Sequence, residues 1–422
     1  MRILVVGLAG TGMAVVEVAR AAGDDVTVVE DRPTGDAYRA RAALAVAAGA
    51  VVLEAPDDTT VADTVATADL VVPSPGVHPD HPAIVRAHAA GIPVRSEVDL
   101  AVERLRQRPH PPRLVAVTGT NGKTTVTTLI AEMLAASGIR ATAAGNIGRP
   151  LVDAAADDVD VVVAEVSSFQ LELTTTAFVP DVAVLLNVAV DHLDWHGSPE
   201  NYTAAKARLF EHQGPNDVLV VNADDPVVVA LAAHAPGRVV WVTADDGPHD
   251  VLNARAATAA ATEAGARPDA IATVLARHET LPHRVQLVGE IAGVRWFDDS
   301  KATNPHATVS ALGGFEHVVL IAGGRNKDLD LGGLGTRSDK LRAVVAIGES
   351  ASEVEAAFVG TGVAVTHAAS MHDAVRTAAA HARAGDVVLL SPACASFDWY
   401  ESYAARGDDF AHEVALLQEV GT

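Results

Sequence analysis

Short runs of valine-rich, wholly apolar residues alternate along the chain with longer stretches in which apolar residues recur at helical spacing. Runs that are apolar throughout are typical of strands buried on both faces of a parallel sheet. The first quarter of the chain holds four such runs, at 3–6, 26–29, 50–53 and 70–73. Because parallel strands need helical crossovers between them, the alternation predicts a doubly wound α/β domain.

The same alternation returns twice further along the chain. The segment 107–113 is polar and rich in proline, as linkers between domains commonly are, and a second block follows it directly. In the third block, valine-rich runs predict strands at 317–321, 343–347 and 386–390. The predicted fold class is α/β with three doubly wound domains, of which the first and last are Rossmann-like. Their expected bounds are 1–107, 108–281 and 282–422.

Composition excludes several classes of protein. The 422 residues carry 31 Lys and Arg against 54 Asp and Glu, which gives a formal net charge of −23. Such a chain is a poor match for nucleic acid and for an anionic membrane surface, both of which need a basic face. The single cysteine, Cys394, excludes an internal disulfide and a cysteine-based zinc site. No apolar run approaches the roughly 20 residues that span a bilayer. We expect a monomer in the cytoplasm.

Lysine is scarce in this chain. Only five of the 31 basic residues are lysines, and arginine cannot replace lysine where a compact point charge is needed. Each lysine therefore merits inspection. They are Lys123, Lys206, Lys301, Lys327 and Lys340.

The strongest local motif is TGTNGKTT at 118–125, which joins a valine-rich run to the start of an expected helix. Backbone N–H groups at such a helix start can cradle phosphates, Lys123 can reach the terminal phosphates, and the hydroxyl of Thr124 can bind Mg²⁺. The motif departs from the strict phosphate loop, because Val117 stands where its first glycine is expected. The alternative is an incidental turn, but the context favours a central domain like the phosphate-loop ATPases.

Two further strand ends carry candidate metal ligands. Glu165 ends a valine-rich run, where a carboxylate suits Mg²⁺ held between the protein and a phosphate. The next such run leads to Asp191, His192 and Asp194. Either acid can instead cap a helix, and Lys206, on the helix expected at 201–210, can be an ordinary solvated lysine. Two strand ends beside one phosphate loop favour a metal site.

The first and third domains carry candidate contacts as well. The glycines of GLAGTG at 7–12 follow a strand, and Glu30 ends the next strand, as in dinucleotide-binding proteins. Ala9 replaces the second glycine of that fingerprint, so either NAD or a uridine diphosphate fits this helix start. In the third domain, polar residues around Asp299, Lys327 and Ser396 follow three predicted strands, where doubly wound domains bind ligands.

Together these motifs resemble the Mur ligase superfamily over nearly the whole chain. TGTNGKTT is the ATP loop that its members share. The segments EVSSFQLE, LPHR, DDSKATNP and LSPACASFD, which start at 165, 281, 298 and 390, resemble the members that add D-glutamate. The resemblance implies an ATP-dependent and Mg²⁺-dependent ligase that joins D-glutamate to UDP-N-acetylmuramoyl-L-alanine through an acyl phosphate, in the cytoplasmic stage of peptidoglycan synthesis.

The resemblance also implies roles for single residues. The catalytic residues would be Lys123, His192, Lys206 and Lys301. Mg²⁺ would be held by Thr124, Glu165, His192 and a carbamylated Lys206. ATP would contact Gly119, Thr120, Asn121, Gly122, Lys123, Thr124, Thr125, Asn253, Arg284 and Asp299. The UDP-linked substrate would contact Gly10, Thr11, Glu30, Asp31, Ser74, Asn146 and Ser167. D-Glutamate and the transferred phosphate would contact Lys301, Thr303, Lys327, Ser396 and Tyr403.

One departure from the family pattern lies in the central domain. The stretch 241–257 runs almost directly from the NADD segment to the motif GPHDVLN, so a hairpin near 243–250 is expected to be trimmed, and Asp250 stands where Asn is usual. Surface loops tolerate such trimming. The departure concerns the adenine pocket near Asn253 and leaves the phosphate and metal motifs intact.

Two other functions stay open at this point. A sister ligase that adds another amino acid, or that extends folate with glutamate, would keep the ATP loop and differ in the third domain. A nucleotide-binding protein without ligase activity would bind NAD(H) and turn over no ATP. The set of Glu165, His192 and Lys206 argues against the second alternative, because a binding protein has no need of it.

Overall fold

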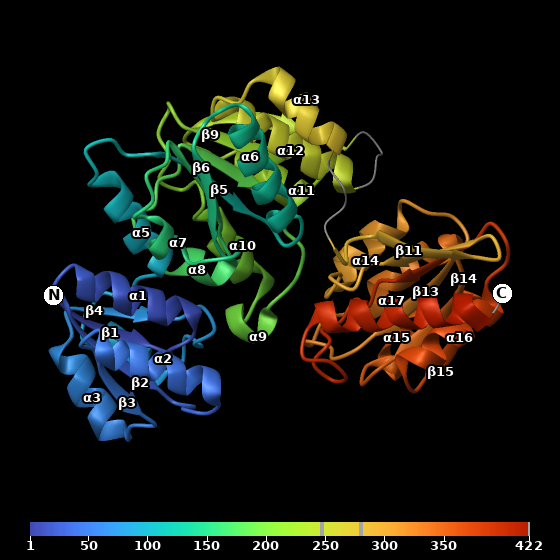
Figure 1. The fold of residues 1–422 in the computed structure, drawn as a ribbon, viewed down its shortest axis with the longest axis horizontal. Coiled ribbons are helices and arrows are strands. Elements are labelled where there is room, and N and C mark those ends of the chain that lie inside the picture. The colour runs from blue at the N-terminus through green and yellow to red at the C-terminus, as the bar shows by residue number, and fades with distance from the viewer. Residues whose placement is uncertain (245–248, 278–281, 421–422) are drawn as a thin grey trace. The chain divides into compact units, whose positions relative to one another are not determined.

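The computed structural model describes residues 1–244, 249–277 and 282–420 and contains three parallel or mostly parallel sheets covered by helices (Figure 1). Its internal contacts divide the chain into two compact units. The first unit comprises Met1–Val188, Glu200–Thr243 and Asn253–Ala276. The second comprises Ala189–Pro199, Ala244–Leu252 and Arg277–Thr422.

The first unit begins with a four-stranded parallel sheet in the order β3-β2-β1-β4. Alternate residues of β1 face opposite cores: Ile3 and Val5 pack with α1, and Leu4 and Val6 pack with α3 and α4. The strands are β1 (Arg2–Val6), β2 (Asp25–Glu30), β3 (Val51–Glu54) and β4 (Leu70–Pro73). The helices are α1 (Gly10–Ala21), α2 (Asp36–Ala47), α3 (Asp58–Thr67), α4 (Pro82–Ala89) and α5 (Glu97–Arg106).

The second sheet of the first unit has six parallel strands in the order β10-β9-β8-β5-β7-β6. The chain runs from β5 to one side and then to the other, so β5 marks the point where the strand order reverses. The strands are β5 (Arg113–Thr118), β6 (Ala141–Gly145), β7 (Val161–Glu165), β8 (Val182–Leu185), β9 (Val218–Asn222) and β10 (Arg238–Val242). The helices are α6 (Lys123–Ala136), α7 (Leu151–Ala154), α8 (Ser168–Glu172), α10 (Pro199–Ala207), α11 (Pro226–Ala232), α12 (His249–Glu263) and α13 (Pro268–Arg277).

The second unit holds a six-stranded sheet in the order β11-β12-β16-β13-β14-β15, in which β11 is antiparallel to β12 and the other pairs are parallel. The strands are β11 (Gln286–Ile291), β12 (Val294–Asp298), β13 (Val318–Gly323), β14 (Leu341–Ile347), β15 (Ala364–Ala368) and β16 (Val387–Leu390). The helices are α9 (Leu193–His196), α14 (Pro305–Leu312), the 3-10 helix η1 (Leu331–Lys340), α15 (Ala351–Ala357), α16 (Met371–His381) and α17 (Tyr403–Val420).

The predicted fold class is confirmed: each sheet is a mostly parallel, helix-covered layer. Every strand predicted from a valine-rich run is present, with ends that differ by at most about two residues, the usual uncertainty of such boundaries. The expected trimmed hairpin falls largely on 245–248, and the expected boundary at 281 falls on 278–281, so both lie outside the described residues. None of the described helices is long and apolar enough to span a membrane.

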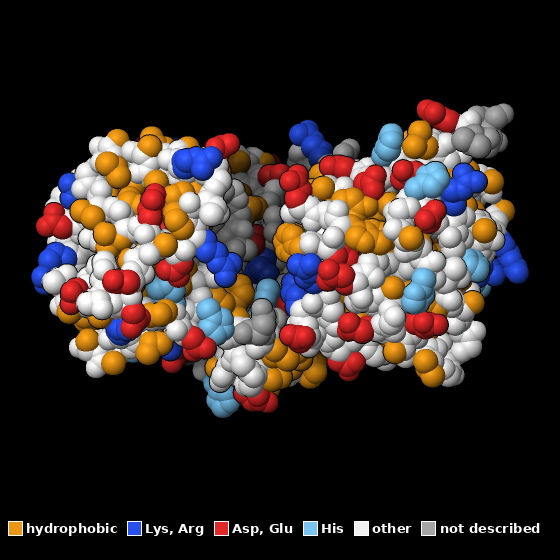
Figure 2. Space-filling model, turned by 90° about the horizontal axis from the view of Figure 1, so that it is seen from below, with side chains coloured by type: hydrophobic (Ala, Val, Ile, Leu, Met, Phe, Trp, Pro, Cys, Tyr) orange, Lys and Arg blue, Asp and Glu red, His pale blue; other side chains and the backbone are white. Residues whose placement is uncertain are grey.

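Charged side chains of both signs are interspersed with apolar and uncharged atoms on the face drawn in Figure 2, rather than gathered by sign. The excess of acidic residues is thus spread over this surface. Such a surface favours solubility and offers this face little attraction for a polyanion.

We predict that Gly145→Ala lowers the free energy of unfolding by about 3 kcal/mol, because the backbone strain of a positive φ adds to a steric overlap. Gly145 ends β6 with a φ of 104°, and a Cβ there would overlap the carbonyl oxygen of Glu165. Gly138 has a φ of 80° but open space around it, so Gly138→Ala should cost only about 1 kcal/mol. Urea unfolding of both variants measures the difference, and equal losses would contradict the overlap.

Candidate functional site

The phosphate loop leaves β5 and enters α6, as the sequence predicts. Gly122 precedes α6 with a φ of 85°, and a Cβ at Gly122 would overlap the side-chain oxygen of Asn253. Asn253 is buried, so the structure brings this predicted ATP contact against the loop. The Lys123 ammonium donates to the carbonyl oxygens of Gly119 at 2.8 Å and Thr120 at 3.0 Å. The loop thereby keeps its one lysine folded along itself, where phosphates would bind.

Two residues that the sequence interpretation missed brace this loop. Asn187, just after β8, accepts from the N–H of Asn121 at 2.8 Å and donates to its carbonyl oxygen at 3.2 Å. The Tyr202 hydroxyl lies 3.0 Å from the hydroxyl of Thr120. Both braces are 2% exposed. Tyr202 precedes Lys206 by one helical turn, and this spacing was the one sign in the sequence that Tyr202 could lie beside Lys206.

Lys206 is buried rather than solvated, with only 1% of the residue exposed. Its ammonium lies over the Tyr202 ring, 4.7 Å from the ring centre. Since Tyr202 also holds Thr120, the phosphate loop and Lys206 share one partner. The interpretation of Lys206 as an ordinary surface lysine is therefore wrong, because burial of a lysine needs specific surroundings.

Glu165 ends β7 and is 2% exposed. Its Oε1 accepts from the side-chain amide of Asn146 at 2.8 Å, whereas its Oε2 is buried and accepts from none of the described residues. A buried carboxylate oxygen without a donor is costly, and a divalent cation with oxygen ligands satisfies it. Thr125 likewise has a buried hydroxyl with no partner among the described residues, whereas Thr124, one residue earlier, is partly exposed. This donor set fits Mg²⁺.

His192 belongs to the second unit, on the segment Ala189–Pro199, and Glu165 and Lys206 belong to the first. His192 precedes α9 with a φ of 53°, and its ring nitrogen lies 3.7 Å from the carboxylate of Asp191. Asp191 is buried and accepts from Asn304 at 3.3 Å, with the ammonium of Lys327 at 4.0 Å. Among the described residues, no group of three or more His, Cys, Asp or Glu that could hold a metal is found.

The first domain places its candidate residues around the end of β1. Gly10 and Thr11 open α1, and the Ser74 hydroxyl donates to the carbonyl oxygen of Gly7 at 2.8 Å. The carboxylate of Glu30 accepts from the N–H of Leu8 at 2.8 Å. Asp31 lies 2.8 Å from the ring of His81. The bonds of Ser74 and Glu30 fix the loop before α1, the place where a nucleotide meets a Rossmann-like domain.

Asn146 and Ser167, the other two candidates for the UDP-linked substrate, belong to the central domain. Asn146 directly follows β6, and its side chain is exposed apart from the bond to Glu165. Ser167 caps α8 by accepting from the N–H of Gln170 at 3.3 Å. Both therefore stand at the carboxyl edge of the sheet, next to the end of β7.

Asp299 and Arg284 lie together in the second unit. Asp299 directly follows β12 and accepts from the Ser391 hydroxyl at 2.7 Å. Burial raises the pKa of the Asp299 carboxyl to about 7, although Ser391 and the nearby charge of Arg284 act in the opposite direction. The structure thus unites two predicted ATP contacts at the end of one strand.

The candidates for D-glutamate follow three strand ends of the same sheet. Lys301 and Thr303 follow β12, Lys327 follows β13, and Ser396 follows β16. The ammonium of Lys301 lies 5.3 Å from the centre of the Tyr403 ring at the start of α17. Lys340, which carried no predicted role, pairs with Glu316.

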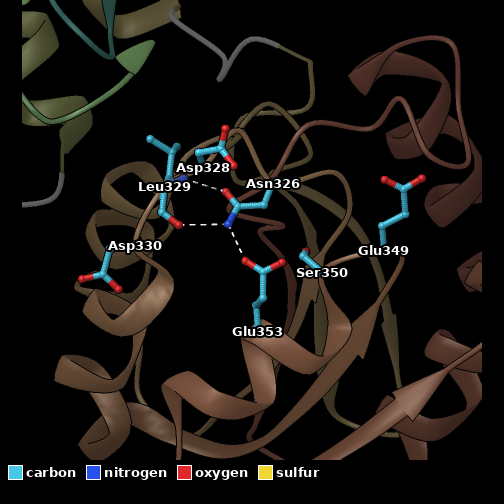
Figure 3. A pocket seen from close by; sticks show the side chains of 7 residues that line it. All are labelled: Asn326, Asp328, Leu329, Asp330, Glu349, Ser350 and Glu353. Atoms are coloured by element: carbon cyan, nitrogen blue, oxygen red, sulfur yellow. Dashed lines mark hydrogen bonds between the residues drawn. The ribbon is translucent and has the colours of Figure 1, made fainter. Parts of the chain in front are cut away.

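A neighbouring hollow in the second unit is acidic (Figure 3). Its lining includes the carboxylates of Asp328, Asp330, Glu349 and Glu353, and Asn326 donates to Glu353 at 2.6 Å and to the carbonyl oxygen of Leu329 at 2.9 Å. A lining of this charge repels carboxylates and phosphates. The hollow therefore does not fit the anionic substrates that the sequence predicts.

Models of three families match successive parts of the chain. They are the Mur ligase MurD-like N-terminal domain at residues 1–96, the Mur ligase middle domain at 117–292 and the Mur ligase glutamate ligase domain at 283–394.

Relatives match over nearly the full length. The UDP-N-acetylmuramoylalanine–D-glutamate ligase of Frankia casuarinae is 43% identical and covers 98% of this chain and 93% of its own. The ligase of that name from Shouchella clausii is 40% identical, covering 99% and 97%.

Two solved structures share the fold. The MurF ligase from Thermotoga maritima in complex with ADP has a TM-score of 0.61 at 19% identity, covering 99% of this chain and 95% of that one. The pseudomurein peptide ligase type C from Methanothermus fervidus has a TM-score of 0.61 at 18% identity, covering 98% and 99%. With the full-length relatives, the chain belongs to the Mur ligases, in the family of the UDP-N-acetylmuramoylalanine–D-glutamate ligases.

Proposed function

We infer that the protein is an ATP-dependent ligase that adds D-glutamate to UDP-N-acetylmuramoyl-L-alanine in peptidoglycan synthesis. The observation that carries this inference is the shared bracing of the phosphate loop and of buried Lys206 by Tyr202. A nucleotide-binding turn without further chemistry gives no reason to bury a lysine beside it. The full-length relatives, whose names state this reaction, support the same function.

The reaction that we propose has two steps. The carboxylate of the acceptor attacks the γ-phosphorus of ATP, the bond to the bridging oxygen breaks, and ADP leaves. The amine of D-glutamate then attacks the acyl carbon of the acyl phosphate, and phosphate leaves with the electron pair of the broken bond while the nitrogen loses its proton. Most of the acceleration comes from positioning and from charge neutralisation, as in other phosphoryl transfers.

Both steps require substrate contacts from residues of this chain. Gly119–Thr125 and Asn253 bind ATP, with Lys123 neutralising its terminal phosphates, and Arg284 and Asp299 complete the nucleotide contacts. Gly10, Thr11, Glu30, Asp31, Ser74, Asn146 and Ser167 bind the acceptor. Lys301, Thr303, Lys327, Ser396 and Tyr403 bind D-glutamate and the transferred phosphate.

Mg²⁺ is the metal that we propose, and its ligands would be Thr124, Glu165, His192 and a carbamylated Lys206. When bound, it supplies positive charge to the phosphate oxygens. The free oxygen of Glu165 supports this assignment. Carbamylation joins CO₂ to the Lys206 amine with loss of a proton, so a cation becomes a carboxylate-like ligand.

We further propose domain bounds at 1–107, 108–281 and 282–422 and a cytoplasmic monomer that needs neither nucleic acid nor membrane. ATP and the UDP-linked acceptor are nucleotides of the cell interior, which supports that location. Size-exclusion chromatography with light scattering tests the oligomeric state.

The first test is ADP release with ATP, Mg²⁺, UDP-N-acetylmuramoyl-L-alanine and D-glutamate. Release should require both the acceptor and D-glutamate. A panel that includes L-glutamate, L-alanine and L-lysine should leave D-glutamate preferred by at least about tenfold. ADP release that is independent of the acceptor, or preference for another amino acid, would refute the proposed function.

Lys206→Ala should lower kcat by about 100-fold or more, because an electrostatic group acting in the transition state is removed. Lys340→Ala is the matched control, since Lys340 makes a surface ion pair with Glu316 and should keep full activity. Short carboxylates such as formate should restore part of the activity of Lys206→Ala. Absence of any such recovery would contradict a carboxylate-like role for Lys206.

Asp299→Asn tests the buried carboxyl through the pH dependence of stability. The folded chain holds a proton on Asp299 between pH 3.8 and about 7, where the unfolded chain does not. The stability that this proton confers is therefore lost as the pH rises through that window. Relative to the parent protein, the melting temperature of Asp299→Asn should rise between about pH 4 and about pH 7 and then level off. The exposed residue Asp408 provides the control, Asp408→Asn, which should show no such trend.

A further inference from the structure

Glu97 is a fully buried acid to which the proposed reaction gives no task. It opens α5 in the first domain, is 1% exposed, and burial raises the pKa of its carboxyl to about 7. Buried carboxylates are costly unless donors compensate them. The donors here come from the central domain, whose helices α7 and α8 lie next to α5 (Figure 1).

One carboxylate oxygen of Glu97 accepts a hydrogen bond from the start of α7. Its Oε2 accepts from the N–H of Val152 at 2.9 Å. The residue before α7 is Pro150, whose side chain cannot accept a hydrogen bond, so Glu97 supplies the acceptor that the helix start lacks.

The other carboxylate oxygen of Glu97 accepts a hydrogen bond from a side chain of α8. Its Oε1 accepts from the side-chain amide nitrogen of Gln170 at 2.9 Å. The amide oxygen of Gln170 accepts from the N–H of Ser167 at 2.9 Å and from the Ser167 hydroxyl at 3.0 Å. Because a backbone N–H can only donate, the amide oxygen must face Ser167 and the amide nitrogen must face Glu97. The carboxylate therefore fixes the orientation of the amide, and the amide fixes the Ser167 hydroxyl.

The chain of bonds ends at the proposed acceptor contacts. Ser167 lies two residues beyond Glu165, the carboxylate that holds Asn146. A buried acid of the first domain is thus linked through two side chains to the residues assigned to the acceptor in the central domain.

Asp99 offers a comparison on the same helix. It is buried, and it accepts from the N–H of Thr175 at 3.0 Å and from Arg95 at 2.5 Å. It joins the same two domains, but its bonds end at Thr175, beyond α8, and not at Ser167.

We propose that Glu97 is a positioning residue for the UDP-linked acceptor, acting through Gln170 on Ser167. The proposal rests on the function inferred above. It assigns to α5 a part in acceptor binding, although Glu97 itself touches no substrate.

Glu97→Gln should raise the KM for UDP-N-acetylmuramoyl-L-alanine by about tenfold, the effect of losing one hydrogen bond to a charged group. A glutamine whose oxygen faces Val152 must turn its NH₂ group toward Gln170. Gln170 then has to flip and present its own NH₂ to the N–H of Ser167, which displaces Ser167. The KM values for ATP and D-glutamate should change less than about twofold, as should kcat.

The double variant E97Q with Q170E reverses the polarity of the pair. The new amide at position 97 then donates its N–H to the new carboxylate at position 170, and that carboxylate accepts from Ser167 in a standard capping box. The double variant should therefore recover an acceptor KM within about threefold of the parent value, while Q170E alone, with two facing carboxylates, should not. A merely structural role for Glu97 predicts no such recovery.

Asp99→Asn is the matched control, and it should leave the acceptor KM unchanged whatever it does to the melting temperature. Gln170→Ala leaves the bond between Glu97 and α7 in place, and it should also raise the KM for the acceptor alone. If Glu97→Gln does not fold, Gln170→Ala tests the proposal in its place. An unchanged acceptor KM in Glu97→Gln or Gln170→Ala, an equal rise for all three substrates, or a double variant no better than Glu97→Gln would overturn the proposal. Failure of the parent protein to release ADP would refute the proposed function instead.

Discussion

The carboxyl ends of parallel strands meet at one edge of a sheet, and the site in the first unit depends on this constraint. β5 lies between β7 and β8, so the phosphate loop, Glu165 and Asn187 arrive at the same edge from segments far apart in the sequence. The strand order reverses at β5, which opens the place where open α/β sheets bind ligands. Close packing keeps the edge compact: Gly145 has no side chain, and this lets the end of β6 approach the backbone of Glu165.

The net charge of the whole chain has the same sign as the charges of its proposed substrates. Every proposed substrate is an anion, whereas the net charge is −23, so the field of the whole protein opposes binding at long range. Positive charge must then act at short range. The N-terminus of α6 and Lys123 supply it at the phosphate loop, where the lysine already lies along the loop carbonyls. The hollow beside Asn326 in the second unit is lined by carboxylates and has the opposite sign of charge.

The sequence was most informative where the signal is local. Strands buried on both faces must be apolar at every position, so the valine-rich runs predicted β1, β4 and β16 closely. The phosphate loop was predictable because its glycines and Lys123 are consecutive. Asn187 was not predicted, because its partner Asn121 comes from another element and no spacing in the chain reveals it. Tyr202 and Gln170 have a local spacing to Lys206 and Ser167, but their partners Thr120 and Glu97 lie far away in the sequence, so their bracing roles were not predicted. The scarcity of lysine was the exception, since a compositional rarity drew attention to Lys206 before its burial was visible.

Glu97 and Asp99 raise the question of why the junction between the first two domains contains buried acids at all. Apolar residues of similar volume often stabilise such a place more, because the desolvation of a carboxylate offsets much of what its hydrogen bonds contribute. Apolar packing, however, has no direction, and two domains joined by it can slide by small amounts at little cost. Glu97 accepts from the fixed backbone N–H of Val152 and from the side-chain amide of Gln170, so the register of α5 against α7 and α8 is set by direction as well as by shape. Asp99 instead ties α5 to Thr175, which lies beyond α8. The acceptor that we propose to contact both domains needs the register that Glu97 sets, because an error in placement of about 1 Å can cost a large factor in rate.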